Sequence, residues 1–262
     1  MMLENSLSPD SITDNLGTCF VGQRVIYYPQ LASTMDVARQ EAQKGAVEGT
    51  VIIADEQIAG KGRIKRIWLS PPGNLALSII LYPDVLYLPC IIMLASLAVA
   101  HSIEAVTGLK SQLKWPNDVL ISDKKVCGIL TESDVQNKAV AYVVIGIGIN
   151  ISMRPSDYPE ILPTTTSLVH ELGRDVSRVD MIRCLLSEVE RLYLTLSIGD
   201  TVYEEWRDRL ITLGKRVKVK SGEAMLEGIA ESVDRDGSLM LRLSDGSSTR
   251  IVAGDVTLRD KT

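Results

Sequence analysis

The sequence predicts an α/β or α+β domain followed by a small β-barrel module. Up to residue 212, apolar stretches with helical spacing alternate with short β-branched runs, as in a domain that mixes helices and sheet. From residue 213 on, short strands are separated by Ser-Gly, Asp-Arg-Asp-Gly and Ser-Asp-Gly turns, which are typical of a small antiparallel sheet. We therefore expect a polar surface extension over residues 1–20, a main domain over 21–212 and the barrel over 213–262.

The composition excludes several classes of partner. The chain is acidic, with 28 Lys and Arg against 33 Asp and Glu. Extended nucleic acid calls for a broad basic face, so this balance predicts no nucleic-acid partner. The longest apolar run, Cys90–Ala100, is too short to cross a bilayer, and the N-terminus has no basic segment of the kind that begins a signal peptide. We expect a cytoplasmic protein with no membrane partner.

The first elements of the main domain have clear limits. β-branched residues predict strands over Arg24–Tyr28 and Thr50–Asp55. Between them, Ser33 and Asp36 form a capping-box pattern, and Gly45 is suited to end the helix that they begin. The Ser33 hydroxyl either caps this helix or faces a ligand at its N-terminus, and the pattern leaves both open.

A cationic loop, residues 59–70, then separates two strands. It holds four cations, two glycines and one tryptophan within twelve residues, and no Asp or Glu occurs from Gln57 through Pro83. Glycines let backbone N–H groups approach an anion while the cations neutralise it, which favours a cradle for phosphate or carboxylate; the alternative is a solvated hairpin tip. A strand over Asn74–Tyr82 follows the loop, and no GxxxxGK[ST] motif is present, so a P-loop ATPase is excluded.

The remaining elements follow from the same patterns. Helices are expected over Pro89–Val106, 177–197 and 200–210, strands over Val119–Ile121, Val126–Ser133 and Ala139–Ile151, and a long polar connection over 152–176. In the barrel, strands are expected over Lys215–Lys220, Ala224–Val233, Leu239–Leu243 and Ser248–Val252. The strand that ends at Ile151 carries a Gly-x-Gly pair, but it lacks the third glycine and the following helix of a dinucleotide site.

Three motifs are informative in combination. They are Gly60-Lys61-Gly62-Arg63 followed by Arg66-x-Trp68-x-Ser70-Pro71-x-Gly73, then Lys114-Trp115-Pro116-Asn117-Asp118, and then Lys125-x-x-Gly128-Ile129-Leu130 with Gly146-x-Gly148-x-Asn150. In the second motif, Pro116 favours an extended conformation for Trp115. In this order the motifs resemble those of the biotin protein ligases, and the resemblance extends from about residue 24 to the end of the chain.

The resemblance implies an α+β fold, in which a mixed-sheet catalytic domain of the biotin/lipoate ligase type is followed by an SH3-like β-barrel. It implies that biotin and ATP, with Mg²⁺ expected at the ATP phosphates and assigned to no side chain, form biotinyl-5′-AMP and pyrophosphate. Biotin then passes to a lysine of a biotin carboxyl carrier protein. A regulatory branch of the family carries a DNA-binding winged helix, for which residues 1–20 are too short, so no repressor activity is expected. A homodimer is compatible with the resemblance.

The resemblance also implies roles for individual residues. Biotin is expected to contact Ser33, Thr34, Met35, Gln57, Gly60, Lys61, Gly62, Arg63, Lys114, Gly128, Gly146 and Gly148. ATP is expected to contact Arg63, Arg66, Trp68, Asn117, Lys125 and Asn150. The residues expected to be catalytic are Arg63, Lys114 and Asp118. Because the first step joins a carboxylate to a triphosphate, fixed cations lower its barrier. Asp118 either helps to deprotonate the incoming lysine or orients Lys114.

Two departures from the family pattern and two rival functions bear on this interpretation. Lys61 stands where many members have arginine, and Met35 where they have asparagine, so ligand affinity is expected to differ most at Met35. A lipoate or octanoate transferase shares the catalytic fold, but the basic loop and the barrel favour biotin. A non-catalytic biotin or nucleotide sensor would have lost a reacting cation, whereas Arg63, Lys114 and Lys125 are all present.

Overall fold

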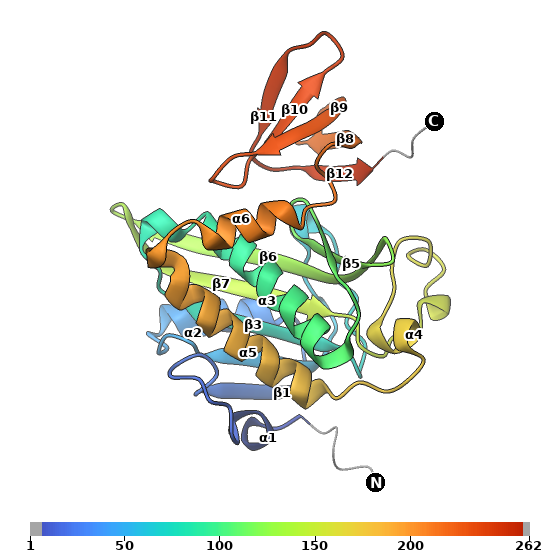
Figure 1. The fold of residues 1–262 in the computed structure, drawn as a ribbon. Coiled ribbons are helices and arrows are strands. Elements are labelled where there is room, and N and C mark those ends of the chain that lie inside the picture. The colour runs from blue at the N-terminus through green and yellow to red at the C-terminus, as the bar shows by residue number, and fades with distance from the viewer. Residues whose placement is uncertain (1–6, 259–262) are drawn as a thin grey trace.

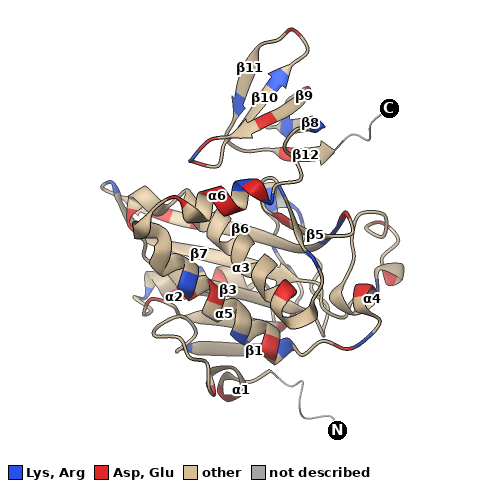
Figure 2. Ribbon diagram, in the orientation of Figure 1, with Lys and Arg blue, Asp and Glu red and all other residues tan. Residues whose placement is uncertain are grey.

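The computed structural model describes residues 7–258, apart from the side chain of Lys65. It has two sheets of unequal size, and Figure 1 shows the smaller sheet packed above the larger one. Figure 2 shows both basic and acidic residues scattered over the two parts of the fold. Helices and mixed sheet occupy the first part of the chain and strands alone the second, so the predicted α+β fold is confirmed.

The larger sheet has seven strands. They are β1 (Val25–Leu31), β2 (Val51–Gln57), β3 (Leu75–Leu81), β4 (Gln112–Lys114), β5 (Asp118–Ile121), β6 (Lys124–Gln136) and β7 (Ala139–Ile149), in the spatial order β1-β2-β3-β7-β6-β5-β4. β1 and β2 are parallel, and the other neighbouring pairs are antiparallel. The sheet is therefore mixed, as predicted.

Helices cover the two faces of this sheet unequally. α3 (Cys90–Thr107) and α5 (Arg178–Thr195) pack on one face, while α2 (Thr34–Gln43) covers part of the other (Figure 1). Side chains alternate between the faces along a strand, so Ile145 of β7 packs with α3 and α5, and Val144 packs with α2. The candidate site lies on the part of this second face that α2 leaves uncovered.

The predicted helices are present. α3 is long and apolar enough to match a membrane span by composition, but most of it is buried against α5 and the sheet. The second helix after the 152–176 connection is α6 (Thr201–Asp208). The connection itself contains a 3-10 turn, η3 (Pro155–Asp157), and a short helix, α4 (Leu168–Leu172), so it is more ordered than its polar composition suggested.

The N-terminal segment differs from the predicted surface extension. Residues 1–6 lie outside the described part of the chain, but α1 (Pro9–Thr13) packs against α5 and β1. Leu7, Ile12 and Leu16 are at most 4% exposed. Three apolar residues among polar neighbours form too short a pattern to predict a helix that docks on the core. The expectation of a surface extension is therefore wrong for residues 7–20.

Glu190 of α5 holds this segment in place. Its carboxylate accepts backbone N–H bonds from Cys19 at 2.6 Å and from Phe20 and Val21 at 2.8 and 2.9 Å. Burial alone would raise the pKa of Glu190, but the three backbone donors stabilise the ionised form and lower the pKa below its ordinary value. A single carboxylate thus joins the start of the main domain to its last long helix.

The smaller sheet is antiparallel and has five strands. They are β8 (Arg216–Ser221), β9 (Ala224–Val233), β10 (Leu239–Leu243), β11 (Ser248–Ile251) and β12 (Asp255–Leu258), in the order β11-β10-β9-β8-β12. The first four correspond to the predicted strands, and the predicted small all-β unit is confirmed. β12 was not predicted, and it pairs with β8 next to the seven-stranded part of the molecule.

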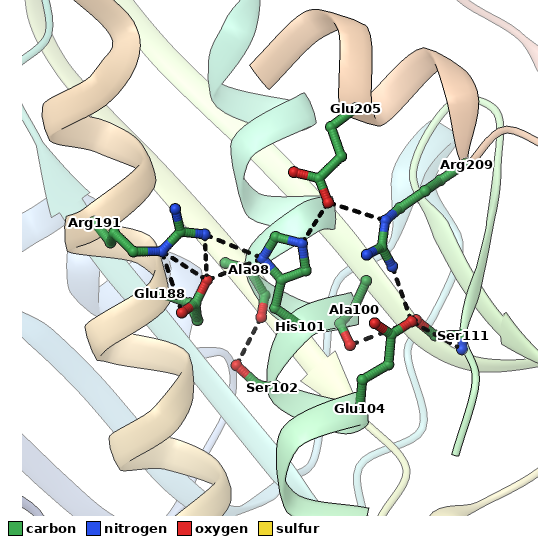
Figure 3. A network of polar contacts seen from close by, with 10 residues as sticks. All are labelled: Ala98, Ala100, His101, Ser102, Glu104, Ser111, Glu188, Arg191, Glu205 and Arg209. Carbon is green, nitrogen blue, oxygen red and sulfur yellow. Dashed lines mark hydrogen bonds and ion pairs between the residues drawn. The ribbon is translucent and has the colours of Figure 1, made fainter. Parts of the chain in front are cut away.

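A network of charged side chains fixes α6, the helix from which the smaller sheet departs (Figure 3). His101 of α3 contacts Glu188 of α5 through Nδ1 at 2.9 Å and Glu205 of α6 through Nε2 at 2.6 Å. Arg209 continues the network to Glu205 at 3.1 Å and to Glu104 at 2.8 Å. His101 therefore has a structural role in joining α3 to α5 and α6.

The two sheets are also joined next to the second motif. Trp115 is 1% exposed, and its Nε1 donates to the carbonyl oxygen of Gly237, in the turn between β9 and β10, at 2.8 Å. Its backbone N–H donates to Thr212 Oγ1 at 3.0 Å, and the Tyr203 hydroxyl of α6 donates to the Val233 carbonyl oxygen at 2.7 Å. Trp115 thus anchors the smaller sheet directly beside Lys114.

Candidate active site

A cavity of about 650 Å³ opens on the uncovered face of the seven-stranded sheet. Sixteen of the eighteen predicted site residues line it: Ser33, Thr34, Met35, Gln57, Lys61, Gly62, Arg63, Arg66, Trp68, Lys114, Asn117, Asp118, Lys125, Gly128, Gly146 and Gly148. Three motifs that are far apart in the sequence therefore meet around one space. Gly60 and Asn150 are the two predicted residues that do not line it.

The floor of the cavity is made of glycines. Gly128 of β6 pairs with Gly148 of β7, and Gly146 lies two residues along β7 on the same face. A Cβ atom at Gly148 would lie 2.2 Å from Trp68 Nε1, and one at Gly146 would lie 2.5 Å from the Met35 sulfur. These glycines are needed because the two large side chains lie directly on the strands.

Ser33 is at the N-terminal end of α2, but its hydroxyl does not cap the helix. The residue occupies the N-cap position with extended backbone, yet the side chain makes no capping hydrogen bond. It is 1% exposed, and its Oγ has no hydrogen-bond partner among the described residues. The helix begins where the sequence predicted. Of the two roles that the sequence left open for the hydroxyl, the structure does not show the capping bond, and the hydroxyl is left available at the cavity.

Neighbouring polar groups form a connected set. Gln57 Oε1, at the end of β2, accepts the Thr34 backbone N–H at 2.8 Å and the Thr34 hydroxyl at 3.1 Å. The Ser78 hydroxyl of β3 donates to Thr34 Oγ1 at 2.8 Å. Three elements therefore hold one cluster of oriented amide and hydroxyl groups beside Ser33.

The cationic loop folds as a hairpin over this floor. Gly62 N–H donates to the Arg66 carbonyl oxygen at 2.8 Å, and Trp68 N–H donates to that of Gly60 at 2.9 Å. A Cβ atom at Gly60 would lie 2.4 Å from the Trp68 carbonyl oxygen, so this glycine closes the hairpin instead of lining the cavity. The loop has the hairpin shape of the alternative interpretation, but Lys61, Arg63 and Arg66 all line the cavity.

The cations of the cavity are held by partners from several elements. Lys61 Nζ lies 2.5 Å from Asp36 Oδ1 of α2, and Lys125 Nζ lies 2.5 Å from Asp118 Oδ1. Lys125 Nζ also lies 5.4 Å from the centre of the Trp68 ring, within the range of a cation–π contact. These contacts join the loop, α2, β5 and β6 around the cavity.

Asn117 links the hairpin to β6. Its Oδ1 accepts a hydrogen bond from Arg63 Nη1 at 3.2 Å, and its Nδ2 donates to the Ile129 carbonyl oxygen at 2.6 Å. Burial lowers the pKa of the Arg63 guanidinium and nearby Arg66 lowers it further, while Asp255 and Asp118 oppose the effect. Arg63 is thus a largely desolvated cation with a fixed orientation.

Lys114 is the last residue of β4, just before the cis Trp115–Pro116 peptide bond. Desolvation lowers the pKa of its ammonium group, and nearby Lys125 and Arg66 lower it further, against the opposite effect of Asp118 and Asp255. Among residues 7–258, Lys114 has no ion-pair partner within 4 Å. It is therefore a half-buried cation without a bound carboxylate, at a cavity where other cations converge.

Asn150 is held away from the cavity. It is 2% exposed, its Nδ2 donates to the Thr166 carbonyl oxygen at 3.1 Å, and its own carbonyl oxygen accepts the Leu168 N–H at 3.0 Å. Its polar atoms thus fix the segment that leads into α4. Asn150 does not line the cavity, and its contact with ATP stays a prediction.

Sequence reasoning missed the contribution of the smaller sheet. Asp255, Val256, Thr257 and Leu258 of β12 line the cavity, as do Pro163 and Thr164 of the long connection. Asp255 Oδ2 lies 2.5 Å from Arg66 Nη2. No local signal could reveal this, because β12 is a four-residue strand whose position depends on how the two sheets dock.

The comparisons with known proteins agree with this geometry. Residues 27–150 match the Biotin/lipoate A/B protein ligase family, and residues 212–259 match the Biotin protein ligase C terminal domain. The chain is 36% identical over 258 residues to Bifunctional ligase/repressor BirA of Bacillus subtilis, and the match covers 96% of this chain and 79% of that relative. The chain belongs to the biotin/lipoate A/B protein ligase family. Within this family it is also 34% identical over 200 residues to Biotin--[acetyl-CoA-carboxylase] ligase of Paracoccus denitrificans, covering 73% of this chain and 83% of that one.

Solved structures of the family have the same fold. A biotin protein ligase from Aquifex aeolicus in complex with biotin and ATP is similar with a TM-score of 0.76 and 26% identity, over 90% of this chain and 99% of that one. A biotin protein ligase from Leishmania major in complex with biotinyl-5-AMP is similar with a TM-score of 0.61 and 25% identity, over 88% of this chain and 99% of that one. The fold and family inferred from the three motifs are confirmed.

Proposed function

We propose that this chain is an ATP-dependent biotin protein ligase, which forms biotinyl-5′-AMP and then transfers biotin to a lysine of a carrier protein. The observation that carries the proposal is the convergence of Arg63, Arg66, Lys114 and Lys125 on one cavity with a glycine floor. Such a cavity suits two anions that must be brought together. Family membership and the ligands of the similar solved structures, biotin with ATP and biotinyl-5-AMP, support the same reaction.

The end of the cavity next to α2 suits biotin. A neutral ureido head needs a few hydrogen-bonding groups set in an apolar wall. Over residues 7–258 the Ser33 hydroxyl has no hydrogen-bond partner. Thr34 and Gln57 lie beside it, and Met35 covers Gly146. We assign the ureido group to these side chains, with the biotin carboxylate directed toward Lys114.

The first step joins the biotin carboxylate to the α-phosphorus of ATP. A carboxylate oxygen forms the new O–P bond, the bond from the α-phosphorus to the bridging oxygen breaks, and pyrophosphate leaves with the electron pair. The barrier is largely repulsion between anions, which fixed cations reduce. Lys114 is half-buried and has no ion-pair partner among the described residues, so its ammonium group is free to bridge the two reactants. Arg63 holds the adenylate, and Trp68 packs beside the nucleotide.

The second step transfers biotin to the carrier. The lysine amine attacks the carbonyl carbon, the C–O bond to phosphate breaks, and AMP leaves. The attacking nitrogen must lose a proton, and Asp118 lies on β5 directly opposite Lys114. Its carboxylate already contacts Lys125 at 2.5 Å, which favours orientation of the cations over proton transfer as its main role.

Mg²⁺ is expected to arrive with ATP. Among residues 7–258, no group of three or more His, Cys, Asp or Glu side chains is arranged to hold a metal ion. Three aspartates line the cavity, and two of them, Asp118 and Asp255, each contact a cation. Mg²⁺ commonly binds through substrate phosphates with few protein ligands, where it neutralises phosphate charge. A homodimer, a cytoplasmic location and the absence of a nucleic-acid partner stay predictions.

The function is tested by label transfer. The purified chain is incubated with ATP, Mg²⁺ and radiolabelled biotin or lipoate, with and without an apo biotin carboxyl carrier domain. We expect label on the carrier from biotin and not from lipoate. Transfer from lipoate alone would show a lipoate ligase. Biotin binding without pyrophosphate release would show a sensor.

A further inference from the structure

β12 brings a carboxylate of the smaller sheet into the cavity of the larger one. Asp255 contacts Arg66 across this junction, with Oδ2 and Nη2 2.5 Å apart. The Arg66 side chain is 67% exposed and that of Asp255 is 22% exposed. Arg66 is thus the partner that is free to change its position, while Asp255 is held by the pairing of β12 with β8.

Asp255 acts on more than one cation. Its negative charge raises the pKa of both Arg63 and Lys114, opposing the desolvation of these two groups. The same cations are those that we assign to the phosphates and the biotin carboxylate. Asp255 therefore lies in the part of the cavity where the phosphates of a nucleotide would be placed.

We propose that Asp255 is a positioning residue that holds Arg66 before ATP binds and competes with the ATP phosphates for it. The proposal rests on the proposed function, because it requires ATP in this cavity. A triphosphate carries more charge than one carboxylate, and an ion pair with a largely exposed arginine is easily exchanged. Binding of ATP transfers Arg66 to phosphate and leaves Asp255 without its ion-pair partner next to the nucleotide.

This exchange links ATP binding to the smaller sheet. The other contacts between the two sheets described above, Trp115 with Gly237 and Tyr203 with Val233, do not involve β12. When Arg66 leaves Asp255, the smaller sheet therefore stays attached to the rest of the protein through the β9–β10 turn and the end of β9. The phosphates of ATP then repel Asp255 and, with it, β12. Asp255 lowers the affinity for ATP and makes that affinity depend on where β12 lies.

The test is a comparison of nucleotides that differ in charge. Dissociation constants for ATP, AMP and adenosine are measured by calorimetry at low salt, in EDTA, with the 262-residue chain and its Asp255→Asn variant. We expect ATP to bind about fivefold more tightly to Asp255→Asn, AMP less so, and adenosine with unchanged affinity. The gain should shrink at high salt because the effect is electrostatic.

Two matched variants control for structural effects. Glu231→Gln removes a carboxylate of the same sheet that pairs with Arg242 on the surface, and it should leave ATP affinity unchanged. Asp255→Glu keeps the charge and should bind ATP as the unmodified chain does. The inference is overturned if Asp255→Asn binds ATP equally or more weakly, or if its affinities for ATP and adenosine shift together. Absence of ATP binding to the unmodified chain, both in EDTA and with Mg²⁺, would overturn the proposed function itself.

Discussion

Ser33 carries a buried hydroxyl that has no hydrogen-bond partner within the described part of the chain. Such a group costs stability unless a ligand supplies its partner. We expect Ser33→Ala to weaken biotin binding about fivefold to tenfold while the free energy of unfolding stays within about 0.5 kcal/mol. Biotin titration by calorimetry and urea unfolding of the same variant provide the two measurements.

Ser167→Ala is the matched control for this prediction. Ser167 is also a buried N-cap serine, but its hydroxyl accepts the His170 N–H at 3.3 Å. Its replacement should lower the free energy of unfolding by about 1 kcal/mol and leave biotin affinity unchanged. If Ser33→Ala behaves in the same way as Ser167→Ala, the Ser33 hydroxyl has a structural role and does not contact biotin.

Lys114 is the cation to which we assign charge stabilisation in the first step. Removal of one donor that acts in a transition state commonly costs about 10²–10³ in rate. We expect Lys114→Ala to reduce the rate of adenylate formation by about that factor, with biotin affinity changed only a few-fold. Exposed Lys110, four residues earlier, gives the control Lys110→Ala, which should react normally. Pyrophosphate release by Lys114→Ala at the normal rate would remove Lys114 from the mechanism.

At the scale of elements, α5 is joined to the N-terminal segment through Glu190. The pKa of this carboxyl is lower in the folded state than its ordinary value. Ionised Glu190 therefore stabilises the fold at every pH above that ordinary pKa. This contribution is lost as the pH falls through the folded-state pKa. We expect Glu190→Gln to lower the free energy of unfolding by about 2 kcal/mol at neutral pH, and by progressively less in acid.

Chemical unfolding at several pH values measures this difference. Exposed Glu223 provides the control, because Glu223→Gln should change stability little at any pH. A difference between the unmodified chain and Glu190→Gln that does not depend on pH would mean that the N–H contacts, and not the charge, hold residues 19–21. The predicted contribution of the Glu190 charge to stability would then be wrong.

The elements around the cavity also explain which site residues could be predicted. Gly128, Gly146 and Gly148 repeat at positions that share one face of paired strands, so a local motif locates them. The hairpin cations form a local cluster without acidic neighbours. By contrast, the missing capping bond of Ser33 depends on its burial beneath other elements, and the capping pattern alone could not reveal it.

At the scale of the whole molecule, the order of strands and helices follows from local patterns, but the docking of distant parts does not. The sequence did not predict α1, because its burial depends on packing against β1 and α5, which both come later in the chain. Asp255 was missed because it reaches the cavity only when the smaller sheet packs against the larger one. Asn150 was assigned to ATP by motif, while its surroundings engage its side chain elsewhere.

In the proposed function, one cavity overcomes the repulsion between a carboxylate and a triphosphate so that biotin is joined to AMP. The most direct measurement is a single turnover of the purified chain with radiolabelled ATP and biotin, in which the products are separated and counted. We predict equimolar biotinyl-5′-AMP and pyrophosphate, formed only when biotin is present. Pyrophosphate release that is independent of biotin, or no adenylate when both substrates are bound, would show that this cavity does not join biotin to AMP.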